Sequence, residues 1–137
     1  MTTAALPPAI RIHGLADARS AATAARELDR PLTLLADGAA GAAWLMAIVA
    51  RLASDHPALP VTGLLDCGDR AGEAQGALAA GMGAILFTGA PGVAARLADI
   101  AAARGAALLT VPPPSLDLRG QRDPVATCRL WLSAPSL

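Results

Sequence analysis

Residues 60–89 (PVTGLLDCGDRAGEAQGALAAGMGAILFTG) contain a strand pattern, an Ala-rich helix pattern and a second strand pattern in succession. Two apolar runs joined by a helix of this length are typical of a parallel βαβ unit. Open α/β sheets hold their ligands at the carboxyl ends of their strands. The first strand here ends in Asp66-Cys67-Gly68-Asp69, so these residues are the first place to look for function.

The same alternation continues along nearly the whole chain. We expect strands at residues 10–13, 32–36, 61–65, 84–88 and 107–111, and helices at residues 15–28, 40–54, 71–80 and 92–104. A chain of 137 residues, 54% of them hydrophobic, has the size and apolar content of one domain over residues 1–137. The sequence therefore predicts a three-layer α/β domain with a five-stranded parallel sheet, flavodoxin-like or Rossmann-like.

The two ends of the chain have their own patterns. We expect residues 1–8 to be a flexible N-terminus, because they lack the pattern of a strand or helix and do not resemble a secretory signal. Residues 112–122 are predicted to be a loop. Residues 123–132 are predicted to be a helix, since Asp123-Pro124 combines an N-cap residue with proline at the first helical position.

Composition and charge exclude several functions. The chain has no lysine, so Schiff-base aldolases, pyridoxal enzymes and Walker-type phosphate loops are excluded. Its 11 arginines balance 11 acidic residues, so we expect no nucleic-acid partner. Cys67 and Cys128 match neither a metal-binding spacing nor a disulfide framework. The longest uninterrupted apolar run, residues 38–50, is shorter than the roughly 20 residues that a bilayer span requires. We therefore expect a cytoplasmic protein without a metal, a cofactor or a membrane span.

Polar side chains follow the predicted strands, and the carboxyl ends of parallel strands share one edge of a sheet. The candidate catalytic residues at this edge are Asp66, Asp69, His13 and Cys67, with Asp37 as a further carboxylate. Carboxylates, imidazole and thiol at one edge can support acid–base chemistry or bind a cation. The alternative is that the aspartates are N-caps and turn residues of the helices that follow.

A glycine-containing loop also suggests binding. The loop that opens a helix at Gly89 and Gly92 is a candidate anion site, because backbone N–H groups at a helix N-terminus attract anions.

The helix at residues 40–54 is apolar on every side around Trp44. This composition predicts an interface formed by Trp44, Leu45, Ile48 and Leu52, through which the chain forms a homodimer or binds another protein. The alternative is that these four residues pack inward and that alanine and glycine form the outer side.

Two short motifs resemble known families. Asp55-His56-Pro57-Ala58-Leu59-Pro60-Val61 and the later Ala77-Leu78-Ala79-Ala80-Gly81 resemble the central part of response-regulator receiver domains, over residues 53–89. The hydroxyl, the lysine and the acidic pair of that family are replaced by Leu65, Thr88 and His13-Gly14, while Asp37 falls at the phosphoacceptor position. This departure implies a pseudo-receiver. The same segment is similar to βα units of TIM-barrel aldolases, without their lysine.

These observations lead to two functional hypotheses. The first is a non-catalytic interaction or regulatory domain that self-associates or binds a partner protein. The alternative is a binder or enzyme for a small phosphorylated or carboxylate metabolite. It would use His13, Asp66 and Asp69 as polar groups and the Gly89 loop as its anion site.

Overall fold

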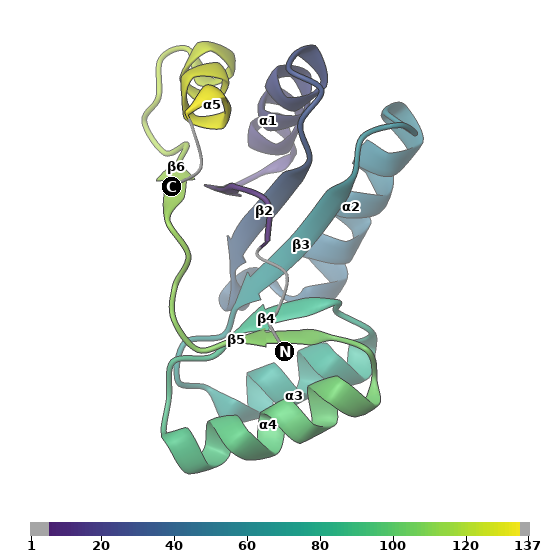
Figure 1. The fold of residues 1–137 in the computed structure, drawn as a ribbon, viewed down its shortest axis with the longest axis vertical. Helices are drawn as coiled ribbons and strands as arrows, with labels where there is room; N and C mark the ends of the chain where they lie inside the picture. The colour runs from purple at the N-terminus through teal and green to yellow at the C-terminus, as the bar shows by residue number, and fades with distance from the viewer. Residues whose placement is uncertain (1–5, 135–137) are drawn as a thin grey trace.

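The computed structural model describes residues 6–134, which form one parallel sheet with helices packed along it (Figure 1). The strands are β1 (Ala9–Arg11), β2 (Leu32–Asp37), β3 (Val61–Asp66), β4 (Ala84–Leu86), β5 (Ala107–Leu109) and β6 (Ser115–Asp117). The helices are α1 (Leu15–Glu27), α2 (Ala42–Asp55), α3 (Ala71–Ala80), α4 (Pro91–Ala103) and α5 (Pro124–Ser133), with a short 3₁₀ turn, η1 (Gly38–Ala40), before α2.

The order of the strands determines where the helices lie. The six strands follow the order β5-β4-β3-β2-β1-β6, and every neighbouring pair is parallel. The chain therefore moves across the sheet in one direction from β1 to β5 and then returns to place β6 beside β1. Connections between parallel strands are almost always right-handed. Four such connections in the same direction place α1 to α4 on one face of the sheet.

Two separate groups of buried side chains correspond to the two faces of the sheet. The larger group joins strand residues such as Ile10, Leu34 and Ile85 to the buried residues of all five helices. The smaller group contains Ala9, Leu35, Leu64, Ala84 and Leu86, and within residues 6–134 no helix residue belongs to it. Successive strand residues point to opposite faces, so the second group belongs to the face that the helices leave uncovered.

The expected class, a parallel sheet flanked by helices, is confirmed, but the sheet has six strands and not five. The sixth strand, Ser115–Asp117, lies in the predicted loop at residues 112–122. It has only three residues, and its partner β1 comes from the opposite end of the chain. No local pattern in the sequence could therefore indicate this pairing.

The arrangement also differs from the expected three layers, because the helices contribute to only one of the two buried groups. Flavodoxin-like and Rossmann sheets reverse direction once, with orders 2-1-3-4-5 and 3-2-1-4-5-6. The strand order here has no such reversal between β1 and β5. Successive strands are neighbours in the same way in (β/α)₈ barrels, but this sheet stays open, with β5 and β6 at its two edges.

The C-terminal helix is held against the start of the chain. The predicted cap is present, since the Asp123 carboxylate accepts a hydrogen bond of 3.1 Å from the backbone N–H of Ala126. The indole N–H of Trp131 donates to the backbone oxygen of Ala9 at 3.1 Å. Arg129 forms an ion pair with Glu27 of α1 at 2.9 Å. These contacts attach α5 to both β1 and α1.

The predicted flexible N-terminus lies mostly outside the described part, since residues 1–5 are not described. Leu6, the first described residue, packs against the smaller buried group. Within residues 6–134, the helices all fall short of the length and apolar character that a membrane span requires.

Two leucines of α5 provide a test of this packing. Leu132 is 1% exposed and Leu130 is 77% exposed. Leu132→Ala should lower the free energy of unfolding by about 2–5 kcal/mol, because it removes buried methyl groups and leaves a cavity. Leu130→Ala should change it by less than about 0.5 kcal/mol. Urea titrations followed by circular dichroism measure both values. Equal effects of the two substitutions would contradict the packing of α5.

Candidate functional site

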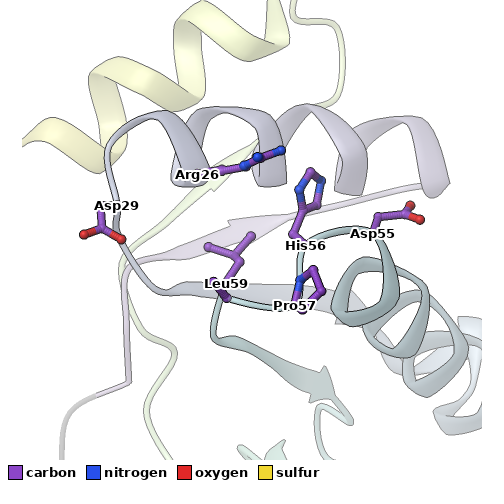
Figure 2. Close-up of a pocket in the computed structure, with 7 residues that line it drawn as sticks. Arg26, Asp29, Asp55, His56, Pro57 and Leu59 are labelled. Atoms are coloured by element: carbon purple, nitrogen blue, oxygen red, sulfur yellow. The ribbon is translucent and has the colours of Figure 1, made fainter.

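A small hollow lies at the amino ends of β2 and β3 (Figure 2). It has a volume of about 140 Å³ and is lined by Arg26, Asp29, Asp55, His56, Pro57, Ala58 and Leu59. The Nδ1 atom of His56 is buried without a hydrogen-bond partner in the described part of the chain. Sites for small molecules usually have about 300 Å³ or more, so this hollow is too small for one.

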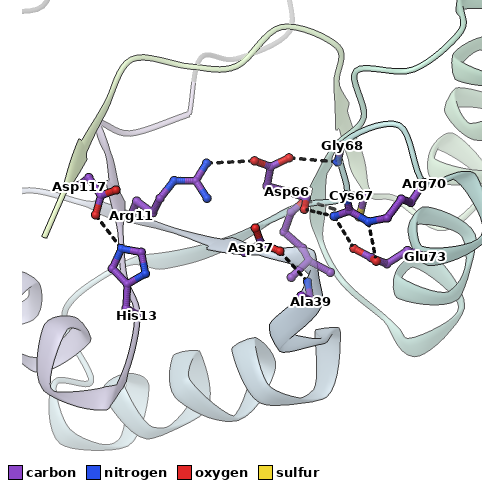
Figure 3. A network of polar contacts seen from close by, with 11 residues as sticks. Arg11, His13, Asp37, Ala39, Asp66, Cys67, Gly68, Arg70, Glu73 and Asp117 are labelled. Carbon is purple, nitrogen blue, oxygen red and sulfur yellow. Dashed lines mark hydrogen bonds and ion pairs between the residues drawn. The ribbon is translucent and has the colours of Figure 1, made fainter. Parts of the chain in front are cut away.

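The opposite edge, where the strands end, gathers most of the polar side chains identified from the sequence. Asp37 pairs in register with Asp66, and Arg11 pairs with Asp117. Because side chains alternate along strands, Arg11, Asp66 and Asp117 point to the same face, the one without helices. Asp37, the last residue of β2, instead directs its carboxylate to the backbone N–H of Ala39 in η1. Figure 3 shows all four with His13 around the ends of the strands.

Arg11 and Asp66 form an ion pair across β2, which lies between their strands. A guanidinium nitrogen of Arg11 lies 3.0 Å from Oδ2 of Asp66, and the two side chains are 24% and 25% exposed. The other carboxylate oxygen, Oδ1, accepts a hydrogen bond of 3.1 Å from the backbone N–H of Gly68. Both oxygens of Asp66 are therefore engaged in holding the edge together.

His13 connects the end of β1 to β6 and to the residues that follow it. Nη2 of Arg119 lies 3.2 Å from Nδ1 of His13. Arginine can only donate a hydrogen bond, so Nδ1 is the acceptor of this contact. Nε2 then donates to the carboxylate of Asp117 at 2.6 Å. Both ring nitrogens of His13 are therefore occupied.

Cys67 is on the opposite face from its neighbour Asp66 and belongs to the helix-covered core. Its side chain is fully buried. Burial raises the pKa of the Cys67 thiol to about 11, and the nearby Glu73 adds to this rise. A thiol that stays protonated and has no access to solvent is a poor nucleophile. Cys128 is also buried, and burial raises its pKa to about 11 as well.

The segments that follow β2 and β3 approach each other closely beside an ion pair. Arg70 binds both carboxylate oxygens of Glu73, at 2.8 and 3.1 Å, and this hydrogen bonding raises the pKa of Arg70 above its ordinary value. Gly38 is buried beside this pair, and a Cβ atom at this position would lie 2.7 Å from the backbone oxygen of Asp66 and overlap Glu73. The close approach of the two loops therefore requires glycine at position 38.

A cavity of about 300 Å³ opens at the same edge, where β1 and β2 end beside the start of α2. It is lined by Ile12, His13, Ala36, Asp37, Ala40 and Trp44. One carboxylate oxygen of Asp37 accepts a hydrogen bond of 2.8 Å from the backbone N–H of Ala39. Trp44 is half-buried. The cavity thus combines an indole ring, apolar walls and a carboxylate.

The structure brings together some of the candidate residues and separates others. His13 and Asp37 line the cavity, whereas Gly89 and Gly92 follow β4, on the other side of β3, and do not line it. A Cβ atom at Gly89 would lie 2.5 Å from the ring of Phe87, which explains glycine there by packing. Asp69 is exposed in the turn before α3 and takes no part in the contacts described above.

The predicted interface on α2 is mostly buried within the protein itself. Leu45, Ile48 and Leu52 pack against the sheet in the larger core group. The outer side of α2 instead presents Met46, which is 37% exposed. Met46 and Val49 line an apolar groove of about 380 Å³ between α2 and the starts of β3 and β4. Association through α2 stays a prediction, and its contacts would come from this groove and from Trp44.

Sequence reasoning missed Arg11, Arg70, Glu73, Asp117 and Arg119. Arg11 had a usable signal, since it is a charged residue between two isoleucines of a short strand. Arg70 and Glu73 had another, because residues three apart at the start of a helix are neighbours. Asp117 and Arg119 had none, since their role depends on the pairing of β6 with β1.

Comparisons with known proteins add no family to this description. Neither a protein-family model nor a curated protein sequence matches the chain. Within residues 6–134 no group of three or more His, Cys, Asp and Glu side chains is placed to hold a metal ion. The function therefore has to be inferred from the site itself.

The hydrogen bond between Asp117 and His13, called the clamp below, predicts that the free energy of unfolding depends on pH. The backbone N–H of Arg119 and the side chain of His13 donate hydrogen bonds to Asp117 and lower its pKa. A lowered pKa stabilises the fold above the unfolded-state value of roughly 4, and this contribution is lost as the pH falls through the folded-state pKa. The Asp117 side chain is 52% exposed, so solvent screening limits the contribution to about 1 kcal/mol.

Asp117→Asn should therefore unfold more easily than the wild type at pH 7, and the difference should vanish by about pH 2. The matched control Asp69→Asn removes an exposed carboxylate from the same edge and should stay within about 0.5 kcal/mol of the wild type. Chemical denaturation across this pH range measures both. A difference for Asp117→Asn that does not change with pH would refute the clamp.

Proposed function

We propose that this chain is a non-catalytic binding domain for a small molecule, and that the ligand occupies the cavity lined by His13, Asp37 and Trp44. The observation that carries the proposal is this hollow of about 300 Å³ at the carboxyl ends of β1 and β2. Its volume is at the lower end of the range for ligand sites, which is about 300–1,000 Å³. Ligands of parallel α/β sheets bind at this edge.

Binding is favoured over catalysis because the reactive groups already have partners. General acid–base catalysis needs a side-chain atom within hydrogen-bond reach of the substrate. Both nitrogens of His13 and both oxygens of Asp66 are occupied within the protein. Cys67 is buried with a raised pKa. Among the polar groups of the cavity wall, Asp37 keeps one carboxylate oxygen that accepts no hydrogen bond within residues 6–134.

The chemical character of the cavity indicates the general form of the ligand. Ile12, Ala36 and Ala40 contribute apolar walls, and Trp44 contributes an aromatic surface. An aromatic ring in the ligand would gain from burial and from stacking on the indole. A hydroxyl or N–H group on the ligand would reach the Asp37 carboxylate. A compact ring with one polar substituent fits these groups.

Benzyl alcohol is a suitable neutral probe, and the two tryptophans allow its position to be measured. The variant Trp131→Phe keeps Trp44 as its only indole, and Trp44→Phe keeps only Trp131. Benzyl alcohol should change the fluorescence of Trp131→Phe saturably, with a Kd on the order of 1 mM for so small a ligand. The fluorescence of Trp44→Phe should hardly change. An equal response from both variants, or no saturable response from Trp131→Phe, would overturn the proposal.

A further inference from the structure

We infer that the ligand of this cavity is a cation: a compact aromatic or otherwise flat apolar group that carries a protonated amine or amidine. This inference rests on the proposed binding function and adds the charge of the ligand to it. It departs from the phosphorylated or carboxylate ligand that the sequence suggested. It follows from the charged side chains at the carboxyl ends of the strands.

The cations at this edge already have partners. Arg11 pairs with Asp66 at 3.0 Å, and Arg70 pairs with Glu73 at 2.8 Å. Arg119 donates to His13 at 3.2 Å. None of these three arginines lines the cavity. An anionic ligand would therefore meet no free guanidinium there unless one of these contacts broke.

The wall of the cavity itself carries a carboxylate. Asp37 is the one acidic residue among those that line the cavity, and both ring nitrogens of His13 are occupied by Arg119 and Asp117. Asp37 takes part in none of the ion pairs found within residues 6–134. Arg70 acts on Asp37 electrostatically without forming an ion pair with it, so a ligand cation would make the direct contact.

The start of α2 has the opposite effect, but the effect is smaller. Gly41 caps this helix without a side-chain hydrogen bond, and a helix N-terminus has the effect of about half a positive charge. Asp37 carries a full negative charge. It also already accepts the backbone N–H of Ala39 in η1. The start of α2 therefore offsets only part of the Asp37 charge.

Trp44 supports the same conclusion independently of Asp37. The face of an indole ring attracts ammonium and guanidinium groups more strongly than other aromatic side chains do. A cationic aromatic ligand can therefore place its charge between Asp37 and the ring of Trp44, both of which line the cavity. A neutral ligand gains the apolar contact and a hydrogen bond without the attraction between charges, and an anion is repelled by the carboxylate.

Three probes of similar shape and different charge test the inference: benzylamine, benzyl alcohol and benzoate. Titrations use the Trp131→Phe variant, with Trp44 as the reporter. Benzylamine should bind about fivefold or more tightly than benzyl alcohol, as expected for one charged contact at a partly exposed site. Benzoate should bind most weakly. Raising the salt concentration should weaken the binding of benzylamine and leave that of benzyl alcohol nearly unchanged.

The substitution Asp37→Asn, made in the Trp131→Phe background, isolates the charge, because asparagine keeps an oxygen that can accept the N–H of Ala39. It should raise the Kd of benzylamine about fivefold and change that of benzyl alcohol by less than about twofold. The control Asp69→Asn should preserve the preference for benzylamine. Thermal unfolding of each variant checks that it is folded, and the salt titration tests the inference without any substitution of Asp37.

The outcomes separate this inference from the proposed function. If benzoate binds as tightly as benzylamine, or if the preference for benzylamine survives both Asp37→Asn and high salt, the ligand is not selected for positive charge. Benzyl alcohol binding at Trp44 would then still support a small-molecule site. If none of the three probes changes the fluorescence of Trp44, the proposed function fails and the inference fails with it.

Discussion

The repetition of one crossover connection, four times in the same direction across the sheet, determines where the helices and the polar residues lie. It places the helices on one face of the sheet and brings the carboxyl ends of all strands to one edge. It also leaves a second face that is filled by strand side chains such as Leu35 and Leu64. Polar residues that are far apart in the sequence meet at this edge for that reason.

Most of these polar residues hold the loops of the edge in place. Asp66 accepts from Arg11 and Gly68, and His13 lies between Asp117 and Arg119. The contacts of Arg11 with Asp66 and of His13 with Asp117 and Arg119 join segments that are distant in the sequence, so together they fix the ends of β1, β3 and β6. The cavity beside α2 is what this arrangement leaves open. In our proposal, Asp37 and Trp44 bind the ligand there, and each also has a structural contact, Asp37 with the backbone of Ala39 and Trp44 with the larger core group.

The sequence predicted the local elements well, because their signals are local. The alternation of strands and helices and the Asp123 cap could be recognised from neighbouring residues. The opposite orientation of Cys67 and Asp66 was also predictable, since adjacent strand residues point to opposite faces. The pairing of β6 with β1 was not, because it depends on contacts between the two ends of the chain. The same long-range contacts place His13 between Asp117 and Arg119.

The position of a bound probe shows whether small molecules bind at the cavity between the ends of β1 and β2. Backbone amide chemical shifts of the ¹⁵N-labelled protein, recorded during a titration with benzylamine, give that position for every residue at once. The largest shifts are expected at residues 12–13 and 36–44, which surround the cavity. Largest shifts at residues 46–50, 61–63 and 81–83 would place the ligand in the apolar groove beside α2 and rule out binding at the cavity.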